Sequence, residues 1–183
     1  NTNYVLTGMV IEKATGNSYA EEIERRIIRP LRLHDTSLPG TSAGIPGPHG
    51  REYSTLSRSG PHAPVHDVTT LDPSLAGASG EMISSTGDLI RFMRALLSGD
   101  VLPQRQLSEM KTTVRAEGHD RYGLGLTRHR LPCGTTVWGH EGTIHGSRST
   151  AVTTPDGSHT AAFNINGDWA GETEALIEAE YCG

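Results

Sequence analysis

Apolar positions near the start of the chain recur with the period of a helix. Residues 4–14 carry apolar side chains three to four positions apart, and Gly16 follows with the freedom to form the left-handed turn that ends a helix. In the next segment Ser18 stands three residues before Glu21, which is the spacing of a capping box, and isoleucines then share one face. We predict one helix in each segment, the second of them stopped by Pro30.

Residues 39–80 lose this period and are rich in Pro, Gly, Ser and His. An irregular stretch of this length in a compact domain usually has a functional reason, so we predict that it lines a cleft. The helical period returns between Ser85 and Gly99, where an apolar stripe runs from a capping serine to a terminating glycine. A shorter helix is predicted at 103–111.

The period changes to two after "RYGLGL", residues 121–126. Alternating apolar and polar residues predict three strands, and a final run of good helix formers predicts a helix at 171–181. The strands are 135–140, 146–154 and 159–166, with the Pro and Gly of "PDGS" forming the turn between the last two. Helices followed by an antiparallel meander indicate the α+β class, with helices packed on an antiparallel sheet.

The 183 residues fit a single domain, with a helical and loop region at about 1–118 and a sheet with a C-terminal helix at about 119–183. The chain has 16 Lys and Arg against 21 Asp and Glu, a formal charge of -5 that offers no broad attraction for nucleic acid or an anionic membrane. No stretch approaches the ~20 apolar residues of a membrane span. We therefore expect neither nucleic acid nor a membrane span.

The stretch "HEGTIH", which runs from His140 to His145, nearly matches the H-E-x-x-H zinc motif. Its histidines are five residues apart, which on a helix separates them by about 140° around the axis, so both could not bind one ion. The three glycines in and around it also disfavour a helix. His62 and His66 have helical spacing, but prolines surround them. We expect no metal and no cofactor, and a zinc hydrolase is the remotest hypothesis.

The S-x-x-K motif of the chain runs from Ser108 to Lys111. In serine enzymes that recognise penicillins, such a pair opens a buried helix and the lysine accepts the proton of the serine. Here the pair ends a short polar helix, where an exposed serine and lysine are the ordinary explanation. The P-loop and C-x-x-C motifs are absent from the sequence.

Five stretches carry a common likeness: "NTNYVLTGMVIEKATGNSYAEEIERRIIRPLRLHDT", "SSTGDLIRFMRALLSGD", "YGLGLTR", "CGTTVWGHEGTIHGSRS" and the closing "YCG". Together they resemble the serine DD-peptidase and class C β-lactamase family, the penicillin-recognising serine hydrolases, and most of all its secreted actinobacterial D-alanyl-D-alanine carboxypeptidases. The resemblance covers nearly all of the chain and is weakest at 39–76. It implies a β-lactamase-like fold, with an antiparallel sheet flanked by helices.

Three active-site motifs mark this family in chain order: S-x-x-K, then Y-x-N, then K-T-G or H-x-G on a late strand. His140, Glu141 and Gly142 match the third motif, and Asn1 matches the last residue of the second. The tyrosine of the second motif and the whole of the first would then lie upstream. The resemblance therefore implies the C-terminal portion of a serine hydrolase, without its nucleophile, and the motif order rules out Ser108.

The resemblance also implies roles for the matched residues. In the family a serine forms an acyl-enzyme that water hydrolyses. The backbone N–H of Thr143 would supply half of the oxyanion hole, and Gly142 would allow close approach of the substrate. His140 would help to hold the catalytic tyrosine hydroxyl, and Asn1 would bond the substrate amide. The partner would be a small molecule or peptide: a peptidoglycan stem peptide, a β-lactam or an ester.

Three positions depart from the carboxypeptidases. Glu141 and Thr127 stand where these relatives have the threonine and arginine that meet a terminal carboxylate, and Leu75 stands where they have a tryptophan at the cleft rim. A glutamate beside a carboxylate is unfavourable, although Arg128 or Arg148 could compensate. Alternatively, Glu141 points outward, because strand side chains alternate between faces.

Three hypotheses remain open at this point. The first is a D-alanyl-D-alanine carboxypeptidase or β-lactamase-like serine hydrolase. The second is an esterase or amidase of the same fold that acts on an uncharged group. The third is a non-catalytic penicillin-binding homologue that keeps the fold and has lost the nucleophile.

Cys133 and Cys182 are the only cysteines of the chain. Two cysteines alone leave a bridge and two free thiols equally open. The secreted relatives resemble this chain at both positions, which implies a disulfide and an extracellular location. We also expect a monomer, and we expect the fragment to be inactive by itself.

Overall fold

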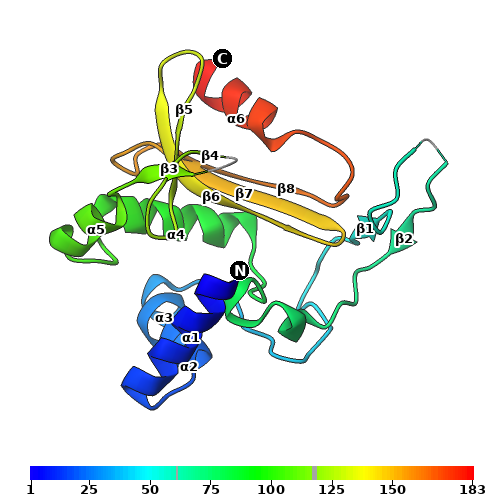
Figure 1. Ribbon diagram of the computed structural model, residues 1–183, viewed down its shortest axis with the longest axis horizontal. Coiled ribbons are helices and arrows are strands. Elements are labelled where there is room, and N and C mark those ends of the chain that lie inside the picture. The colour runs from blue at the N-terminus through cyan, green and yellow to red at the C-terminus, as the bar shows by residue number, and fades with distance from the viewer. Residues whose placement is uncertain (61, 117–118) are drawn as a thin grey trace.

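The computed structural model describes residues 1–60, 62–116 and 119–183 (Figure 1). Its centre is a six-stranded antiparallel sheet in which every strand lies beside its neighbour in the sequence. The strands are β3 (Val114–Ala116), β4 (His119–Tyr122), β5 (Thr127–Arg130), β6 (Thr136–Ile144), β7 (Ser147–Thr153) and β8 (Thr160–Ile165). The antiparallel meander and the α+β class predicted from the sequence are confirmed.

Helices cover both faces of this sheet, as Figure 1 shows. On one face α4 (Thr86–Ser98) packs on β7 and β8, with α5 (Gln104–Met110) next to it, and on the other face lies α6 (Thr173–Cys182). The buried cluster on the α4 side consists of Met93, Leu96, Leu97, Leu107, Leu126, Trp138 and Ala151, and that on the α6 side of Leu131, Val137, Val152, Ala161 and Ile177. No helix among the described residues is long and apolar enough to cross a membrane.

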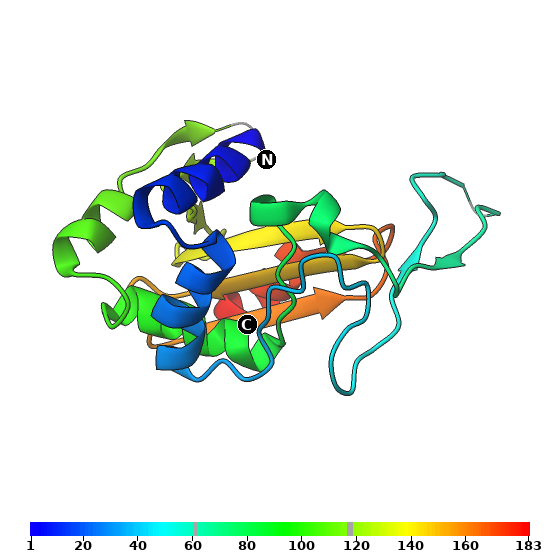
Figure 2. The same ribbon diagram turned by 90° about the horizontal axis from the view of Figure 1, so that it is seen from below.

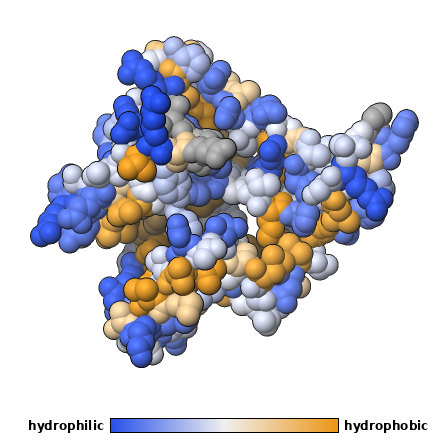
Figure 3. Space-filling model, in the orientation of Figure 1, coloured by the Kyte–Doolittle hydropathy of each residue, from blue (hydrophilic) through white to orange (hydrophobic). Residues whose placement is uncertain are grey.

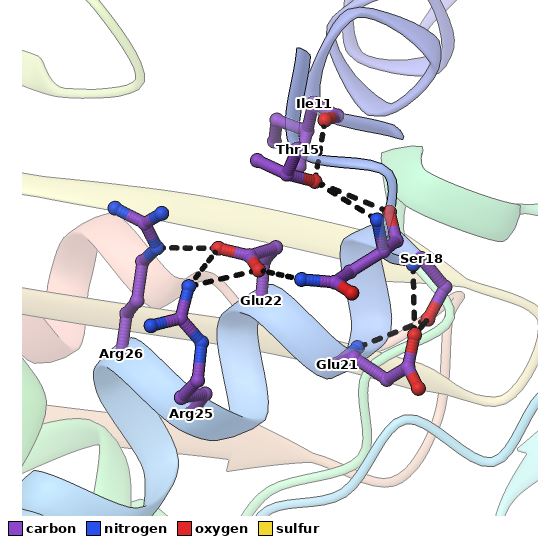
Figure 4. A network of polar contacts seen from close by, with 8 residues as sticks. Ile11, Thr15, Ser18, Glu21, Glu22, Arg25 and Arg26 are labelled. Carbon is purple, nitrogen blue, oxygen red and sulfur yellow. Dashed lines mark hydrogen bonds and ion pairs between the residues drawn. The ribbon is translucent and has the colours of Figure 1, made fainter. Parts of the chain in front are cut away.

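The N-terminal helices begin and end largely as predicted. α1 (Thr2–Thr15) ends at Gly16 in the left-handed conformation, and Ser18 and Glu21 form the predicted capping box at the start of α2 (Tyr19–Ile23). The carboxylate of Glu22, which is buried, accepts hydrogen bonds from Arg25, Asn17 and Arg26 (Figure 4). These bonds lower the pKa of Glu22 to about 2, so the carboxylate anchors the first turns as an anion.

The second helical segment ends at Leu31, one residue after the predicted stop at Pro30. The chain continues through a π-helical turn, η1 (Glu24–Ile28), into the short α3 (Arg29–Leu31). In the π turn the N–H of Arg29 bonds the carbonyl of Glu24, five residues back. Pro30 therefore lies at the start of a new α-helical turn, a position where its missing N–H costs little.

Segment 39–80 contains only short elements, in agreement with its composition. They are β1 (Tyr53–Ser54), β2 (His66–Asp67), η2 (Pro73–Leu75) and η3 (Gly77–Ser79). The paired β1 and β2 lie beyond the end of the six-stranded sheet in both views (Figures 1 and 2). Gly146, in the turn between β6 and β7, meets this segment so closely that a Cβ there would lie 2.8 Å from the Cβ of Glu52.

The strand predictions were incomplete in two respects. The strand predicted at 135–140 continues to Ile144, because the residues after His140 stay paired with β7 instead of turning. Strands β3, β4 and β5 were not predicted, since β5 reads "TRHR" and shows no apolar alternation. The sheet accordingly begins at Val114, slightly before the predicted boundary at about 119.

Cys133 and Cys182 form a disulfide. It joins the turn after β5 to the last residue of α6, across 49 residues of chain. The predicted bridge is confirmed, and it ties the C-terminal helix to the sheet.

Candidate active site

Strand β6 has two strand neighbours over only part of its length. β5 pairs with β6 only as far as Gly139, whereas β7 continues beside β6 as far as Ile144. Over residues 140–144 every second pair of backbone N–H and C=O groups therefore points away from β7, toward an open edge. The carbonyl of Glu141 is met by His140 Nδ1 at 2.6 Å and not by a strand. This contact indicates that Glu141 and, two residues on, Thr143 turn their backbone groups to the open edge.

Thr143 is exposed at this edge. An N–H group of fixed direction can stabilise a negative oxygen that develops beside it. The oxyanion role of Thr143 stays a prediction, and its place on β6 is compatible with that role. The role expected of Glu141 also stays a prediction: Glu141 is exposed, and strand alternation puts it on the opposite face from His140.

The two glycines of β6 serve different purposes. A Cβ on Gly139 would lie 2.1 Å from the backbone oxygen of Ala151, so packing against β7 demands a glycine there. A Cβ on Gly142 would meet nothing closer than Ser149 Oγ at 3.6 Å, which is an ordinary contact. The fold itself does not need a glycine at 142, and the bare backbone leaves room beside the open edge for a ligand.

His140 is the end of a chain of hydrogen bonds that leads to α1. Its Nε2 lies 3.0 Å from the hydroxyl of Tyr122, which lies 2.6 Å from the hydroxyl of Tyr4. Burial raises the pKa of Tyr122 above its usual value, and the bond to Tyr4 adds to the rise, so Tyr122 remains a protonated donor. Tyr4 is one turn from Asn1, which caps α1, and the third motif is thereby joined to the start of α1.

Tyr4 and Tyr122 were not predicted as site residues. Both lie within stretches that carry the family likeness, "NTNYVLTG" and "YGLGLTR", but nothing in the spacing of the sequence shows that their hydroxyls meet. The pairing depends on Tyr4 of α1 reaching Tyr122 at the end of β4, which only the folded chain brings about.

The other predicted substrate contacts lie elsewhere. Thr127 is 0% exposed and its hydroxyl donates to the Gly139 carbonyl, so it fastens β5 to β6 and offers no surface to a substrate. Arg128 is half-buried opposite Trp138 in the β5–β6 pair. Leu75 is exposed in η2 and lines a separate pocket of about 350 Å³ against α1. The structure therefore groups His140, Gly142 and Thr143, with Tyr122, and leaves Thr127 and Leu75 outside that group.

The remaining candidates from the sequence have other positions. Ser108 is exposed on α5, and Lys111 donates to the Pro155 carbonyl and lies over the Trp138 ring. His145 lies just beyond the end of β6. Its Nδ1 is 3.4 Å from Oδ2 of Asp168. Among the described residues no group of three His, Cys, Asp or Glu side chains could hold a metal ion.

Comparison with known proteins gives a consistent picture. The Beta-lactamase family profile matches residues 1–178. "Penicillin-binding protein 4*" of Bacillus subtilis (strain 168) is 26% identical over 185 residues, which is 97% of this chain and 41% of that protein. "Penicillin-binding protein 4" of Amycolatopsis lactamdurans is 26% identical over 183 residues, which is 91% of this chain and 46% of that protein. The chain thus spans less than half the length of these relatives.

Solved structures extend the comparison. The D-stereospecific amidohydrolase from Streptomyces sp. superposes with a TM-score of 0.95 at 55% identity, over 100% of this chain and 54% of that one. The D-amino acid amidase from Ochrobactrum anthropi SV3, solved with L-phenylalanine amide, superposes with a TM-score of 0.73 at 30% identity, over 91% of this chain and 49% of that one. The family resemblance and the β-lactamase-like fold inferred from the sequence are confirmed.

Proposed function

Because the chain belongs to the Beta-lactamase family, we propose that the full-length protein is a serine amidohydrolase that works through an acyl-enzyme. The observation that carries the proposal is the open edge of β6. There Gly142 and Thr143 are exposed on the same strand as His140, in a chain 55% identical to a D-stereospecific amidohydrolase. The comparisons favour the amidase alternative over the carboxypeptidase reading of the sequence.

The proposed substrates are amides of D-amino acids. Support comes from the names of the similar structures, a D-stereospecific amidohydrolase and a D-amino acid amidase solved with D-phenylalanine and with L-phenylalanine amide. If Glu141 meets the substrate as expected from the sequence, its carboxylate disfavours a substrate that ends in a carboxylate. An amide leaving group carries no such charge.

The proposed reaction has two steps. The serine oxygen attacks the amide carbon, and the amine leaves with a proton to give an ester on the serine. Water then attacks the ester, which releases the acid and restores the serine hydroxyl. In both steps the Thr143 N–H would stabilise the oxyanion, and His140 would position the proton-transfer groups beside it.

We place the nucleophile on a segment outside these 183 residues. The chain covers 54% of the amidohydrolase structure, and among the described residues Lys111 donates to the Pro155 carbonyl and no hydrogen bond joins it to Ser108. A second observation agrees: apolar side chains gather on the face formed by α1 and η2 (Figure 3), and the exposed ones are Val5, Leu6, Met9, Val10 and Leu75. Such a face is suited to cover by a further segment of the same protein.

We also propose that the protein is exported. The Cys133–Cys182 disulfide supports this location, because disulfides persist in oxidising environments.

The test is acylation followed by turnover. A labelled fluorophosphonate should modify the full-length protein at a serine upstream of Asn1, and the protein should release ammonia from D-phenylalanine amide. A peptide ending in D-alanyl-D-alanine, assayed in parallel, distinguishes an amidase from a carboxypeptidase. Modification at Ser108, or no modification at all, would overturn the proposal.

A further inference from the structure

A pocket of about 500 Å³ lies at the end of β6, just beyond the proposed oxyanion donor. Its wall includes Thr143 and His145 from the β6 end, Ser57 and Arg58 from the loop after β1, and Asp168 and Trp169 from the segment after β8. A substrate whose carbonyl carbon sits at Thr143 must place its acyl part or its leaving group on one side of that residue. The pocket lies on the side of Thr143 that faces Ile144 and His145.

Asp168 is the anionic group of this pocket. One of its oxygens, Oδ2, accepts hydrogen bonds from the Ser54 hydroxyl at 2.6 Å and from the Gly146 N–H at 3.1 Å, and it lies 3.4 Å from His145 Nδ1. Burial raises the pKa of Asp168, but these bonds outweigh it and hold the pKa below its usual value. Asp168 is therefore ionised at neutral pH and is fixed in place by its neighbours.

The second oxygen of Asp168 is open to a ligand. Among the described residues nothing donates a hydrogen bond to Oδ1, although the side chain is only 13% exposed. A carboxylate held by one oxygen and free at the other can accept a charge-assisted hydrogen bond from a cation. Low exposure strengthens such a pair, because water screens it less.

The rest of the wall matches an amino acid. Trp169 is 48% exposed, which is unusual for so large an apolar side chain, and Ile144 lies in the same wall. These residues can pack against a substrate side chain while Asp168 holds a charged group beside it. Arg58, which is exposed and carries a positive charge, also lines the pocket. It weakens the attraction of the pocket for a cation, but it forms no ion pair with Asp168 among the described residues.

We propose that this pocket binds the acyl part of the substrate and that Asp168 pairs with its free α-ammonium group. The inference rests on the proposed function and narrows it to donors with an unblocked amine. A blocked donor, such as an N-acetylated amino acid amide, would leave Oδ1 of Asp168 desolvated without a hydrogen-bond partner, which disfavours its binding.

The experiment compares two substrates on the full-length protein, D-phenylalanine amide and N-acetyl-D-phenylalanine amide. The native protein should prefer the free amine by about tenfold or more in kcat/KM. In Asp168→Asn the side-chain oxygen can still accept from Ser54 and Gly146, so the fold is preserved while the charge is removed. This variant should lose most of the preference, chiefly through KM for the free amine.

Arg58→Gln is the matched variant of opposite charge. It should lower KM for the free amine, since it removes a like charge from the same pocket. Equal losses on both substrates in Asp168→Asn, or a native protein without preference, would overturn the inference. These results are distinct from failure of the proposed function, which would appear as no fluorophosphonate labelling and no turnover of either substrate.

Discussion

The hydroxyl of Tyr122 lies 3.0 Å from Nε2 of His140. On the other side of the ring, Nδ1 lies 2.6 Å from the carbonyl of Glu141, which can only accept a hydrogen bond. Nδ1 therefore carries a proton, and in the neutral ring Nε2 accepts from Tyr122. Tyr4 in turn donates to the oxygen of Tyr122 at 2.6 Å. The tautomer of His140 is thus set by the Glu141 carbonyl on its own strand, and it makes the Tyr122 hydroxyl the donor to Nε2.

The first prediction concerns this hydrogen-bond chain. Tyr122→Phe removes the donor to His140, and one such bond is worth about 1 kcal/mol, so kcat/KM of the full-length protein should fall by about fivefold to tenfold. The unfolding temperature should change little. Tyr4→Phe is the control, since it leaves the Tyr122 donor in place and should cost less. Unchanged activity in Tyr122→Phe would show that the ring is held by other means.

A second prediction separates the two glycines of β6. Gly142→Ala should fold normally, because the added Cβ makes only an ordinary contact with Ser149, yet kcat/KM should fall by about 100-fold as the substrate is displaced. Gly139→Ala should instead lose about 3 kcal/mol or more of stability, because its Cβ overlaps the Ala151 oxygen. Circular dichroism and amide hydrolysis measure both effects. A folded and fully active Gly142→Ala variant would show that close approach of the substrate to the open edge of β6 is not needed for catalysis.

The disulfide gives a third prediction. Cys133→Ser combined with Cys182→Ser removes a cross-link over 49 residues, and the free energy of unfolding should fall by about 2–4 kcal/mol. Chemical denaturation under oxidising and reducing conditions should show the same difference in the native protein and none in the double variant. Activity under native conditions should persist, since the bridge lies at the α6 end of the sheet.

Glu22 gives a prediction about acid. Hydrogen bonds from Arg25, Asn17 and Arg26 lower its pKa from 4.5 to about 2. A carboxyl whose pKa is lower in the folded state stabilises the fold above its unfolded pKa, and this stability is lost as the pH falls from 4.5 to 2. In Glu22→Gln the unfolding temperature should be a few degrees lower at pH 7, and the difference should vanish near pH 2. An equal deficit at both values would assign the effect to packing.

Glu52 should show the opposite sign. Its Oε2 is buried and has no hydrogen-bond partner among the described residues, and burial raises its pKa above 4.5. A carboxyl whose pKa is raised in the folded state costs stability as the pH rises through that pKa. Glu52→Gln should therefore raise the unfolding temperature at pH 7, with the gain shrinking as the pH falls toward 4.5. A lower unfolding temperature at pH 7 would contradict this sign.

The sequence by itself determined the features that depend on neighbouring residues. The capping box of Ser18 and Glu21, the glycine that ends α1 and the apolar stripe of α4 were all predicted, because each acts within a few residues of chain. The family motif at His140 to Gly142 was found for the same reason. The π turn before Pro30 was not predicted, since such a turn is not visible in local propensities.

Only the tertiary structure decided what depends on contacts across the chain. β5 reads as polar and became a strand because β4 and β6 supply its hydrogen bonds. The family resemblance implied a substrate contact at Thr127, whereas the folded chain buries this side chain and bonds it to the Gly139 carbonyl. Tyr4 meets Tyr122, and Ser54 meets Asp168, over 118 and 114 residues of sequence. Such pairs have no period and no local signal, because packing alone brings their side chains together.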